Sequence, residues 1–241
     1  MHLASLLHAL GLDETRCCHC LAPMPRGGLA ARNIPTLRLC RACLDELGGA
    51  PCSVCRLCGL PLGPEDEPLC ADCRKQPPPW SGMACFGPYA GLLRDLILRL
   101  KFDGELNLAR LLAELLLQAC SCLPSPDVII PVPQHAAGLR RRGFNQVREI
   151  GRYLQKLTGL KLDYRLLRRI KAGAPQEALG AQERCENLRN AFLAASRVSG
   201  LRIWLLDDVV TTGSTCRYAA EALLAAGAAD VHVLACARTY L

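Results

Sequence analysis

The stretch from Ile203 to Thr215, IWLLDDVVTTGST, constrains the fold of this 241-residue chain more than any other. An apolar run predicts a buried strand. Two adjacent acids and a hydroxyl-rich turn with one glycine follow it, and the next residues, 214–226, have the apolar period of a helix. Backbone N–H groups and hydroxyls at a helix N-terminus suit a phosphate, and paired carboxylates at a strand end can accept hydrogen bonds from a vicinal diol. The stretch therefore predicts a site for a ribose 5-phosphate group.

The same stretch resembles the signature with which type I phosphoribosyltransferases bind 5-phosphoribosyl 1-pyrophosphate (PRPP). The resemblance implies that Asp207 and Asp208 bind the ribose hydroxyls and that Mg²⁺ is held mainly by PRPP, with water links to these acids. It also implies that a five-residue turn binds the 5-phosphate: Thr211, Thr212, Gly213, Ser214 and Thr215. Oxopurine-salvage members carry an Asp where Thr211 stands, which argues against that specificity. The alternative is a plain strand-to-helix turn with a Thr or Ser cap.

Strands and helices alternate from Met83 onward. The apolar period predicts helices over 91–100, 105–123 and 144–157, and short apolar runs predict buried strands over 127–132, 202–206 and 231–237. This alternation favours an α/β fold with a largely parallel sheet. Because ligands of such sheets bind at the carboxyl ends of the strands, the loops after Val132 and Leu206 are the expected site.

The loop after the first of these strands leads into an arginine cluster. We expect a pyrophosphate group to be bound there by Val132, Pro133, Arg140 and Arg141. Residues 134–190 hold 13 basic and 5 acidic residues, so their net charge of +8 exceeds the +7 of the whole chain. The basic excess suits a polyanion such as pyrophosphate. A solvated basic helix face and a nucleic-acid patch are the alternatives.

The N-terminal part is rich in cysteine, with 10 of the 16 cysteines in residues 1–73. Four pairs have two residues between the thiols, a spacing that lets one tight turn aim both at a single ion. Pairing neighbours predicts two structural zinc sites in a double zinc ribbon, with Cys18 and Cys52 left over. Their ligands are Cys17, Cys20, Cys40 and Cys43 for the first, and Cys55, Cys58, Cys70 and Cys73 for the second. A disulfide cluster or an iron–sulfur site is the alternative.

Taken together, these features resemble the ComF family. The cysteine pairs match its double zinc ribbon, and two further blocks match its motifs: 131–133 with 142–146, and Pro175-Gln176 with Leu179, Arg184, Asn187 and 191–192. The family often has Thr before Pro-Gln, where this chain has Ala174. The resemblance implies a type I phosphoribosyltransferase fold and a link to natural competence. It favours Arg142 and Arg184 as the catalytic cations that stabilise charge on the leaving pyrophosphate. It supplies no acceptor substrate.

The sequence thus predicts a zinc-ribbon domain over residues 1–76 and a phosphoribosyltransferase-like α/β domain over 83–241. Residues 1–12 are predicted to form a short amphipathic helix rather than a signal peptide, and no segment is predicted to enter a membrane, so we expect a cytoplasmic protein. The expected partners are PRPP and, through DNA uptake, single-stranded DNA or helicase proteins. A non-catalytic PRPP sensor or a DNA- or partner-binding adaptor is the alternative to an enzyme.

Overall fold

The computed structural model describes residues 15–24, 38–48, 53–63, 68–134, 136–170 and 191–240. The helix expected at residues 1–12 lies outside these ranges, as do Cys52, the Pro175-Gln176 block and Arg184. None of the described helices is both long and apolar enough to cross a bilayer.

A four-stranded sheet forms the centre of the molecule, and all of its strand pairs are parallel. Its strand order is β3-β8-β7-β4. The two central strands are nearly continuous runs of buried residues, as expected for parallel strands covered on both faces. The strands are β3 (Gly82–Pro88), β4 (Val128–Pro131), β7 (Arg202–Val210) and β8 (Asp230–Arg238).

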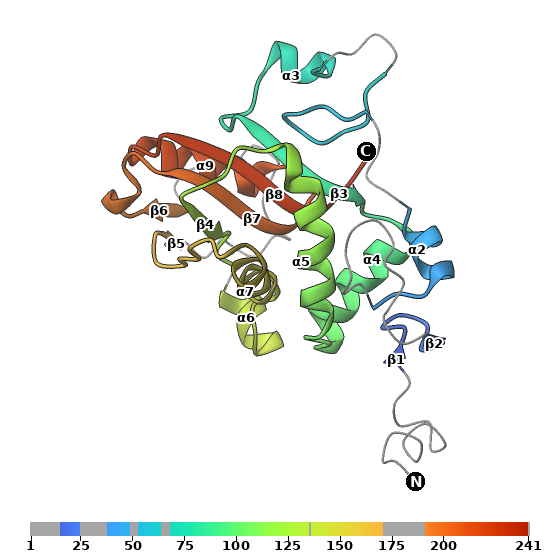
Figure 1. Cartoon of the computed structure of the whole chain (residues 1–241). Coiled ribbons are helices and arrows are strands. Elements are labelled where there is room, and N and C mark those ends of the chain that lie inside the picture. The colour runs from blue at the N-terminus through green and yellow to red at the C-terminus, as the bar shows by residue number, and fades with distance from the viewer. Residues whose placement is uncertain are drawn as a thin grey trace, which may run out of the picture.

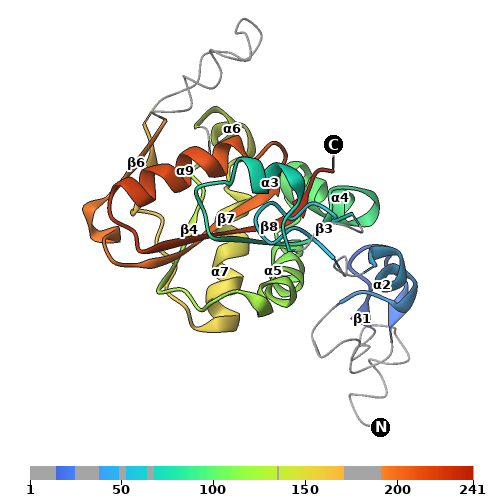
Figure 2. The same ribbon diagram turned by 90° about the horizontal axis from the view of Figure 1, so that it is seen from above.

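Helices cover both faces of this sheet (Figure 2). One core layer lies between the sheet and α4 (Gly91–Leu98), α5 (Leu108–Ala119) and α7 (Gln146–Thr158). The other layer lies between the sheet and α9 (Ser214–Ala225). Successive side chains of a strand alternate between the two layers: Leu206 packs with α5 and α7, and Leu205 packs with α9.

Shorter elements complete this part of the chain. A five-residue π-helical turn, Arg99–Asp103, continues α4, and 3₁₀ turns follow at Cys120–Cys122 and Ser196–Val198. The helix α6 (Ala136–Arg142) connects β4 to α7, and the strands β5 (Leu167–Arg169) and β6 (Phe192–Ala194) form a small antiparallel pair.

The cysteine-rich segments attach to this α/β unit in two different ways (Figure 1). The first holds β1 (Thr15–Arg16), β2 (Pro23–Met24) and α2 (Arg41–Leu47), and its apolar side chains belong to the same core layer as α4 and α5. The second holds α3 (Ala71–Lys75) and has only a small apolar cluster of its own, built on Cys55, Leu57 and Cys73. The division into domains 1–76 and 83–241 stays a prediction.

The structure confirms the predicted fold class and moves several boundaries. The strand β7 runs four residues past the predicted end at Leu206, so both acids lie inside the strand rather than in the loop after it. Arg140, Arg141 and Arg142 form the last turn of α6 rather than a loop. The strand β3 was not predicted, because two glycines and a proline in seven residues hide its β pattern.

Candidate functional site

The segment predicted to bind the 5-phosphate, residues 211–215, is called the phosphate turn. It follows the end of β7 and includes the first residues of α9. Gly213 stands before the helix with φ of 81°, a left-handed conformation that favours glycine. The first helical hydrogen bond runs from the Arg217 N–H to the Gly213 carbonyl, so the N–H groups before it have no helical partner. The Thr212 and Ser214 hydroxyls lie 2.9 Å apart beside them. The turn therefore combines amide donors, hydroxyls and a helix dipole, as an anion site requires.

The paired acids stand at the C-terminal end of β7, and both are buried, with 8% of Asp207 and 6% of Asp208 exposed. Asp207 belongs to the face that carries α9, where the Cys216 thiol lies 3.9 Å from its Oδ2. Asp208 belongs to the face that carries α7, where its Oδ2 accepts a 2.8 Å hydrogen bond from Gln146 Nε2. Each also accepts the N–H of the residue that follows it, at 2.9 Å. The two carboxylates thus start from opposite faces of one strand.

Burial raises the pKa of the Asp207 carboxyl well above its ordinary value, and the neighbouring Asp208 adds to this effect. Lys101 acts in the opposite direction, since its positive charge favours the carboxylate. The pKa of the Cys216 thiol is also raised, by burial and then by Asp207. Cys216 is therefore a protonated core thiol that donates to Asp207, and nothing indicates a reactive thiolate there.

A chain of hydrogen bonds joins the loop after β4 to Asp208. Arg142 Nη2 donates to Gln134 Oε1 at 2.6 Å, Gln146 Nε2 donates to the same oxygen at 3.3 Å, and Gln146 then donates to Asp208. Gln146 is 1% exposed, and its Oε1 has no hydrogen-bond partner among the described residues. Asn145 fixes the start of α7 by accepting the Arg148 N–H at 3.1 Å, which sets the position of Gln146.

Two of the other predicted anion-binding residues lie in the loop at the carboxyl end of β4, and two lie on α6. The Val132 N–H donates to the Leu206 carbonyl at 2.8 Å, which ties the loop after β4 to β7. Pro133 is half-buried in that loop, and Arg140 and Arg141 are exposed at the end of α6. The structure thus brings Arg142 into the network with Asp208 and leaves Arg140 and Arg141 outside it.

Sequence reasoning missed three residues of this region. Gln134 and Gln146 were not predicted as site residues, although they connect the loop after β4 to Asp208. Lys101 lies in the π-helical turn that continues α4, close enough to act on Asp207. A π-helical turn often marks a functional position, but no periodicity in the sequence predicts one.

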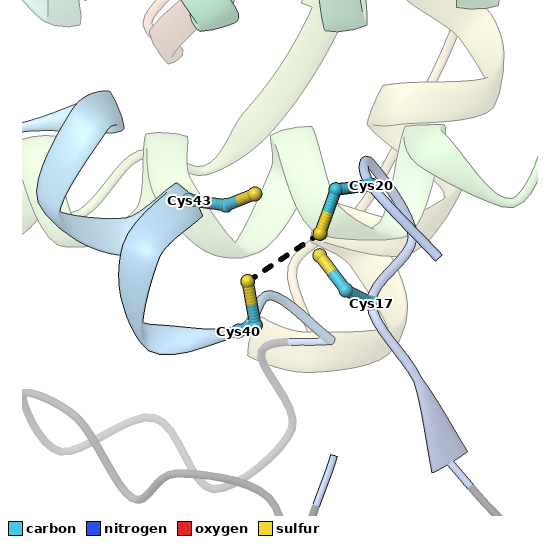
Figure 3. A group of neighbouring side chains, drawn as sticks. All are labelled: Cys17, Cys20, Cys40 and Cys43. Atoms are coloured by element: carbon cyan, nitrogen blue, oxygen red, sulfur yellow. Dashed lines mark hydrogen bonds between the residues drawn. The ribbon is translucent and has the colours of Figure 1, made fainter. Parts of the chain in front are cut away.

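The cysteines form the two groups that the spacing predicted. Within each group all four sulfur atoms lie within 4.8 Å of one another, and Figure 3 shows those of the first group pointing to a common centre. The sulfur atoms of Cys20 and Cys40 are 3.5 Å apart, and those of Cys58 and Cys70 are 3.7 Å apart. A tetrahedral ion with Zn–S bonds of about 2.3 Å separates its sulfur atoms by about 3.8 Å. Both groups therefore fit a zinc ion.

Each group combines a tight turn with a helix start. The first pair of thiols lies on a turn, and the second pair lies at the beginning of α2 or α3 rather than on a second hairpin turn. Burial raises the pKa of Cys17 and Cys55, but neighbouring backbone N–H groups outweigh it and lower both values to about 7. Burial raises the pKa of the spare Cys18 to about 11. These pKa values favour the thiolate form of Cys17 and Cys55, the first ligand of each Cys₄ group, and the thiol form of Cys18.

The parallel sheet, the acids at the end of β7, the phosphate turn and the preceding Cys₄ groups define the class: a phosphoribosyltransferase-like α/β fold with a zinc-ribbon-like N-terminal part. No family model matches the chain. Among curated proteins, it is 40% identical to the DNA utilization protein YhgH of Salmonella typhi over 193 residues, which cover 78% of this chain and 85% of that protein. It is 34% identical to competence protein F of Haemophilus influenzae, over 92% of this chain and 96% of that protein.

Competence protein ComFC of Bacillus subtilis is more distant, at 24% identity over 81% of both chains. Among solved structures, an allosteric regulatory enzyme of purine biosynthesis aligns with 53% of this chain at 24% identity and a TM-score of 0.36, and the chain spans 25% of that longer protein. The identities to competence protein F and YhgH extend over most of both chains. This protein belongs to the ComF family.

Proposed function

We propose that the protein binds PRPP with Mg²⁺ at the carboxyl edge of its sheet. The observation that carries the proposal is the hydrogen-bond chain from Arg142 through Gln134 and Gln146 to Asp208, because it joins the predicted pyrophosphate loop to the predicted ribose site. In this proposal Asp207 and Asp208 accept from the ribose hydroxyls, and residues 211–215 bind the 5-phosphate. Val132, Pro133, Arg140 and Arg141 bind the pyrophosphate group.

The reaction class that this site supports is phosphoribosyl transfer. An acceptor nucleophile forms a bond to C1 of the ribose, the bond between C1 and the pyrophosphate oxygen breaks, and the acceptor gives up its proton. Positive charge develops on the ribose ring and negative charge on the leaving pyrophosphate. Arg142 stabilises that negative charge, together with Arg184, which lies outside the described residues. Mg²⁺, when bound with PRPP, neutralises part of the same charge.

The N-terminal Cys₄ groups are proposed to hold two zinc ions in a structural role. All eight ligands are thiols, so neither ion keeps an open position for a substrate or a reactive water. The described residues of the second segment form only a small apolar cluster, so we expect this segment to need its metal crosslink to fold.

The biological setting follows from the relatives, whose names refer to competence and to DNA utilization. We propose that this protein also acts in DNA uptake. The second candidate function, a non-catalytic adaptor for single-stranded DNA or a DNA-uptake helicase, rests on Arg140 and Arg141, which are exposed at the end of α6 in the basic stretch 134–190. Phosphate contacts of that kind weaken steeply with salt.

The first experiment is calorimetric titration of PRPP with Mg²⁺ into the zinc-loaded protein and into an Asp207→Asn/Asp208→Asn variant. Binding by the wild type, and a loss of about 100-fold or more in the variant, is expected because two charge-assisted acceptors disappear. Circular dichroism and zinc content check that the variant is folded. Absence of binding by the wild type would contradict the proposal.

Turnover is tested separately, by pyrophosphate release with nucleobases, amines and nucleic acids as acceptors. A protein that binds PRPP but releases no pyrophosphate with any of them is a PRPP sensor rather than a transferase. For the adaptor function, an Arg140→Glu/Arg141→Glu variant should weaken single-stranded DNA binding and lower its salt dependence. Because the proposed pyrophosphate site uses the same two arginines, a loss of PRPP affinity in this variant supports that site, and an unchanged PRPP affinity with weaker DNA binding supports the adaptor.

A further inference from the structure

The second Cys₄ segment is attached to the α/β unit by a row of consecutive backbone carbonyls. The turn that carries Cys55 and Cys58 presents the carbonyls of residues 56, 57, 58 and 59, and each accepts from a side chain or N–H of the unit. The donors are the Met83 N–H at 2.8 Å, Trp80 Nε1 at 2.5 Å, Arg238 Nε at 3.1 Å and the Cys85 thiol at 3.9 Å. These contacts hold the metal-binding turn against the edge strand β3.

Arg238, at the end of β8, extends this attachment to the phosphate turn. While its Nε donates to the Cys58 carbonyl, its Nη1 donates to the Val210 carbonyl at 3.0 Å and to the Thr239 carbonyl at 3.1 Å. Val210 is the last residue of β7, directly before the phosphate turn. Arg238 is 8% exposed, and no carboxylate of the described ranges lies within ion-pair distance of it. One buried guanidinium therefore joins a cysteine of the second group to the start of the turn.

Trp80 supports the other end of the same turn. Its ring lies 3.6 Å from the point where a Cβ on Gly213 would stand, while its indole N–H bonds the Leu57 carbonyl. A cavity of about 460 Å³, lined in part by Cys58, Thr212, Gly213 and Arg238, separates the rest of the turn from the second Cys₄ segment. Because the turn is not packed solidly on this side, the Arg238 and Trp80 contacts contribute to its position. The Thr239 N–H, which donates to the Val210 carbonyl at 2.9 Å, is the backbone contact beside them.

The first Cys₄ segment is held by a comparable arginine that has no such connection. Arg99 donates to the Cys18 carbonyl at 3.2 Å and to the His19 carbonyl at 3.5 Å, and it pairs with Glu105 at 2.7 Å. None of its partners belongs to residues 207–215. Two arginines of the α/β unit thus donate to the cysteine turns, Arg99 to the first and Arg238 to the second, and Arg238 also donates to the Val210 carbonyl before the phosphate turn.

We propose that Arg238 is a positioning residue for the phosphate turn, through which metal occupancy of the second Cys₄ group, and not of the first, sets the affinity for the phosphorylated ligand. This inference rests on the proposed PRPP function. With the second ion bound, the carbonyl of Cys58 is fixed and orients the guanidinium, which donates to the Val210 carbonyl and so reinforces the backbone hydrogen bond from the Thr239 N–H. Without that ion the turn at residues 55–58 loses its crosslink, and Arg238 loses one of the fixed acceptors that orient it.

The test compares Arg238→Met with Arg99→Met in the zinc-loaded full chain, with Arg238→Lys as the conservative variant. Two readouts are used: the calorimetric affinity for PRPP with Mg²⁺, and ligand-free hydrogen exchange of the peptide that covers residues 211–215. For Arg238→Met we expect affinity to fall about tenfold, as for the loss of a charge-assisted hydrogen bond, and exchange of the turn to rise. Arg238→Lys should show smaller changes than Arg238→Met in PRPP affinity and in exchange of the turn. Arg99→Met should leave both the affinity and the exchange unchanged.

The metal is tested with Cys70→Ser, which removes a ligand of the second group, and Cys40→Ser, which removes one of the first, with zinc content measured for each. Faster exchange at residues 211–215 in Cys70→Ser alone supports the inference. Equal effects of the two arginine variants, or of the two cysteine variants, overturn it. If Arg238→Met does not fold, Arg238→Lys and Cys70→Ser decide. If the wild type binds no PRPP, the proposed function fails, and the exchange readout still decides the positioning of the turn.

Discussion

Replacing Asp207 with Asn should stabilise the protein while weakening PRPP binding. Asp207 is buried on the α9 face, and its carboxyl pKa is raised by burial and by Asp208. An acid whose pKa is higher in the folded state lowers stability at every pH above its unfolded value, because the unfolded chain gives up the proton first. Asn removes this cost and keeps the oxygen that accepts the Asp208 N–H at 2.9 Å.

The size of the effect follows from the partners of the carboxyl group. One oxygen has a good backbone donor, and the other faces the Cys216 thiol at 3.9 Å, which is a weak donor. The neighbouring Asp208 carboxyl raises the pKa of Asp207 further. Removing the charge from a buried carboxyl group that lacks strong donors is worth about 1 to 3 kcal/mol. For a chain of this length that corresponds to a rise in Tm of about 2 to 12 °C. A variant that is more stable and binds less PRPP would show a site maintained at the expense of the fold.

The assay is thermal unfolding of wild type and Asp207→Asn between pH 4 and pH 8. At about pH 4, the ordinary Asp value, the two should be equally stable, and the advantage of the variant should grow as pH rises toward the raised pKa. Asp127→Asn is a control in which the change in stability should have the opposite sign. The hydrogen bonds that Arg202 donates to Asp127 lower the pKa of the Asp127 carboxyl. That variant should lose stability at neutral pH and match the wild type at low pH. A less stable Asp207→Asn, or a difference independent of pH, would refute the reasoning.

Three further variants or conditions test other parts of the structure. Gly151→Ala lies inside α7, where Ala is worth about 1 kcal/mol more than Gly in an exposed helix interior. Urea unfolding should show none of this gain, since a Cβ there would stand 3.0 Å from Leu162 Cδ1 and 3.3 Å from Leu206 Cδ2; a full gain would contradict this. Gln146→Leu should lower the free energy of unfolding by about 1 to 3 kcal/mol and weaken PRPP binding, because Asp208 loses its side-chain donor. The exposed Gln155→Leu is the control. Equal losses of stability and PRPP affinity in the two variants would contradict this prediction. Zinc affinity, measured by chelator competition, should fall as pH drops below 7, because thiols must be deprotonated to bind; a constant affinity from pH 8 to pH 5 would contradict the tetrathiolate assignment.

Several features could be predicted because their information is local in the sequence. Two residues between cysteines set the tight turn that aims both thiols at one point, whatever the rest of the chain does. The order of strand, acids, turn and helix between Ile203 and Thr215 likewise follows from the apolar run, the glycine and the helical period. The fold class followed from such pieces because strands that alternate with helices must pair in parallel.

The contacts that organise the site depend on residues far apart in the chain. Gln146 reaches Asp208 across 62 positions, and Arg238 reaches Cys58 across 180. No local pattern gives such a pair, since a glutamine on a helix or an arginine ending a strand has the same propensities whether or not it finds a partner. The edge strand β3 shows the same limit: its glycines and proline hide it, and it is a strand because β8 and the Arg56 carbonyl accept its hydrogen bonds.

Local patterns of residues therefore establish the kinds of chemistry present: two sets of four thiols, a pair of acids and a turn rich in N–H groups and hydroxyls. The connections between these groups arise only when distant segments pack together. Tertiary structure set the acids on opposite faces of β7, brought Arg142 to one of them through two glutamines, and attached the second Cys₄ turn to the phosphate turn through Arg238. The physical reason is that spacing fixes local geometry, whereas packing of the sheet and its helices fixes which buried polar groups find each other.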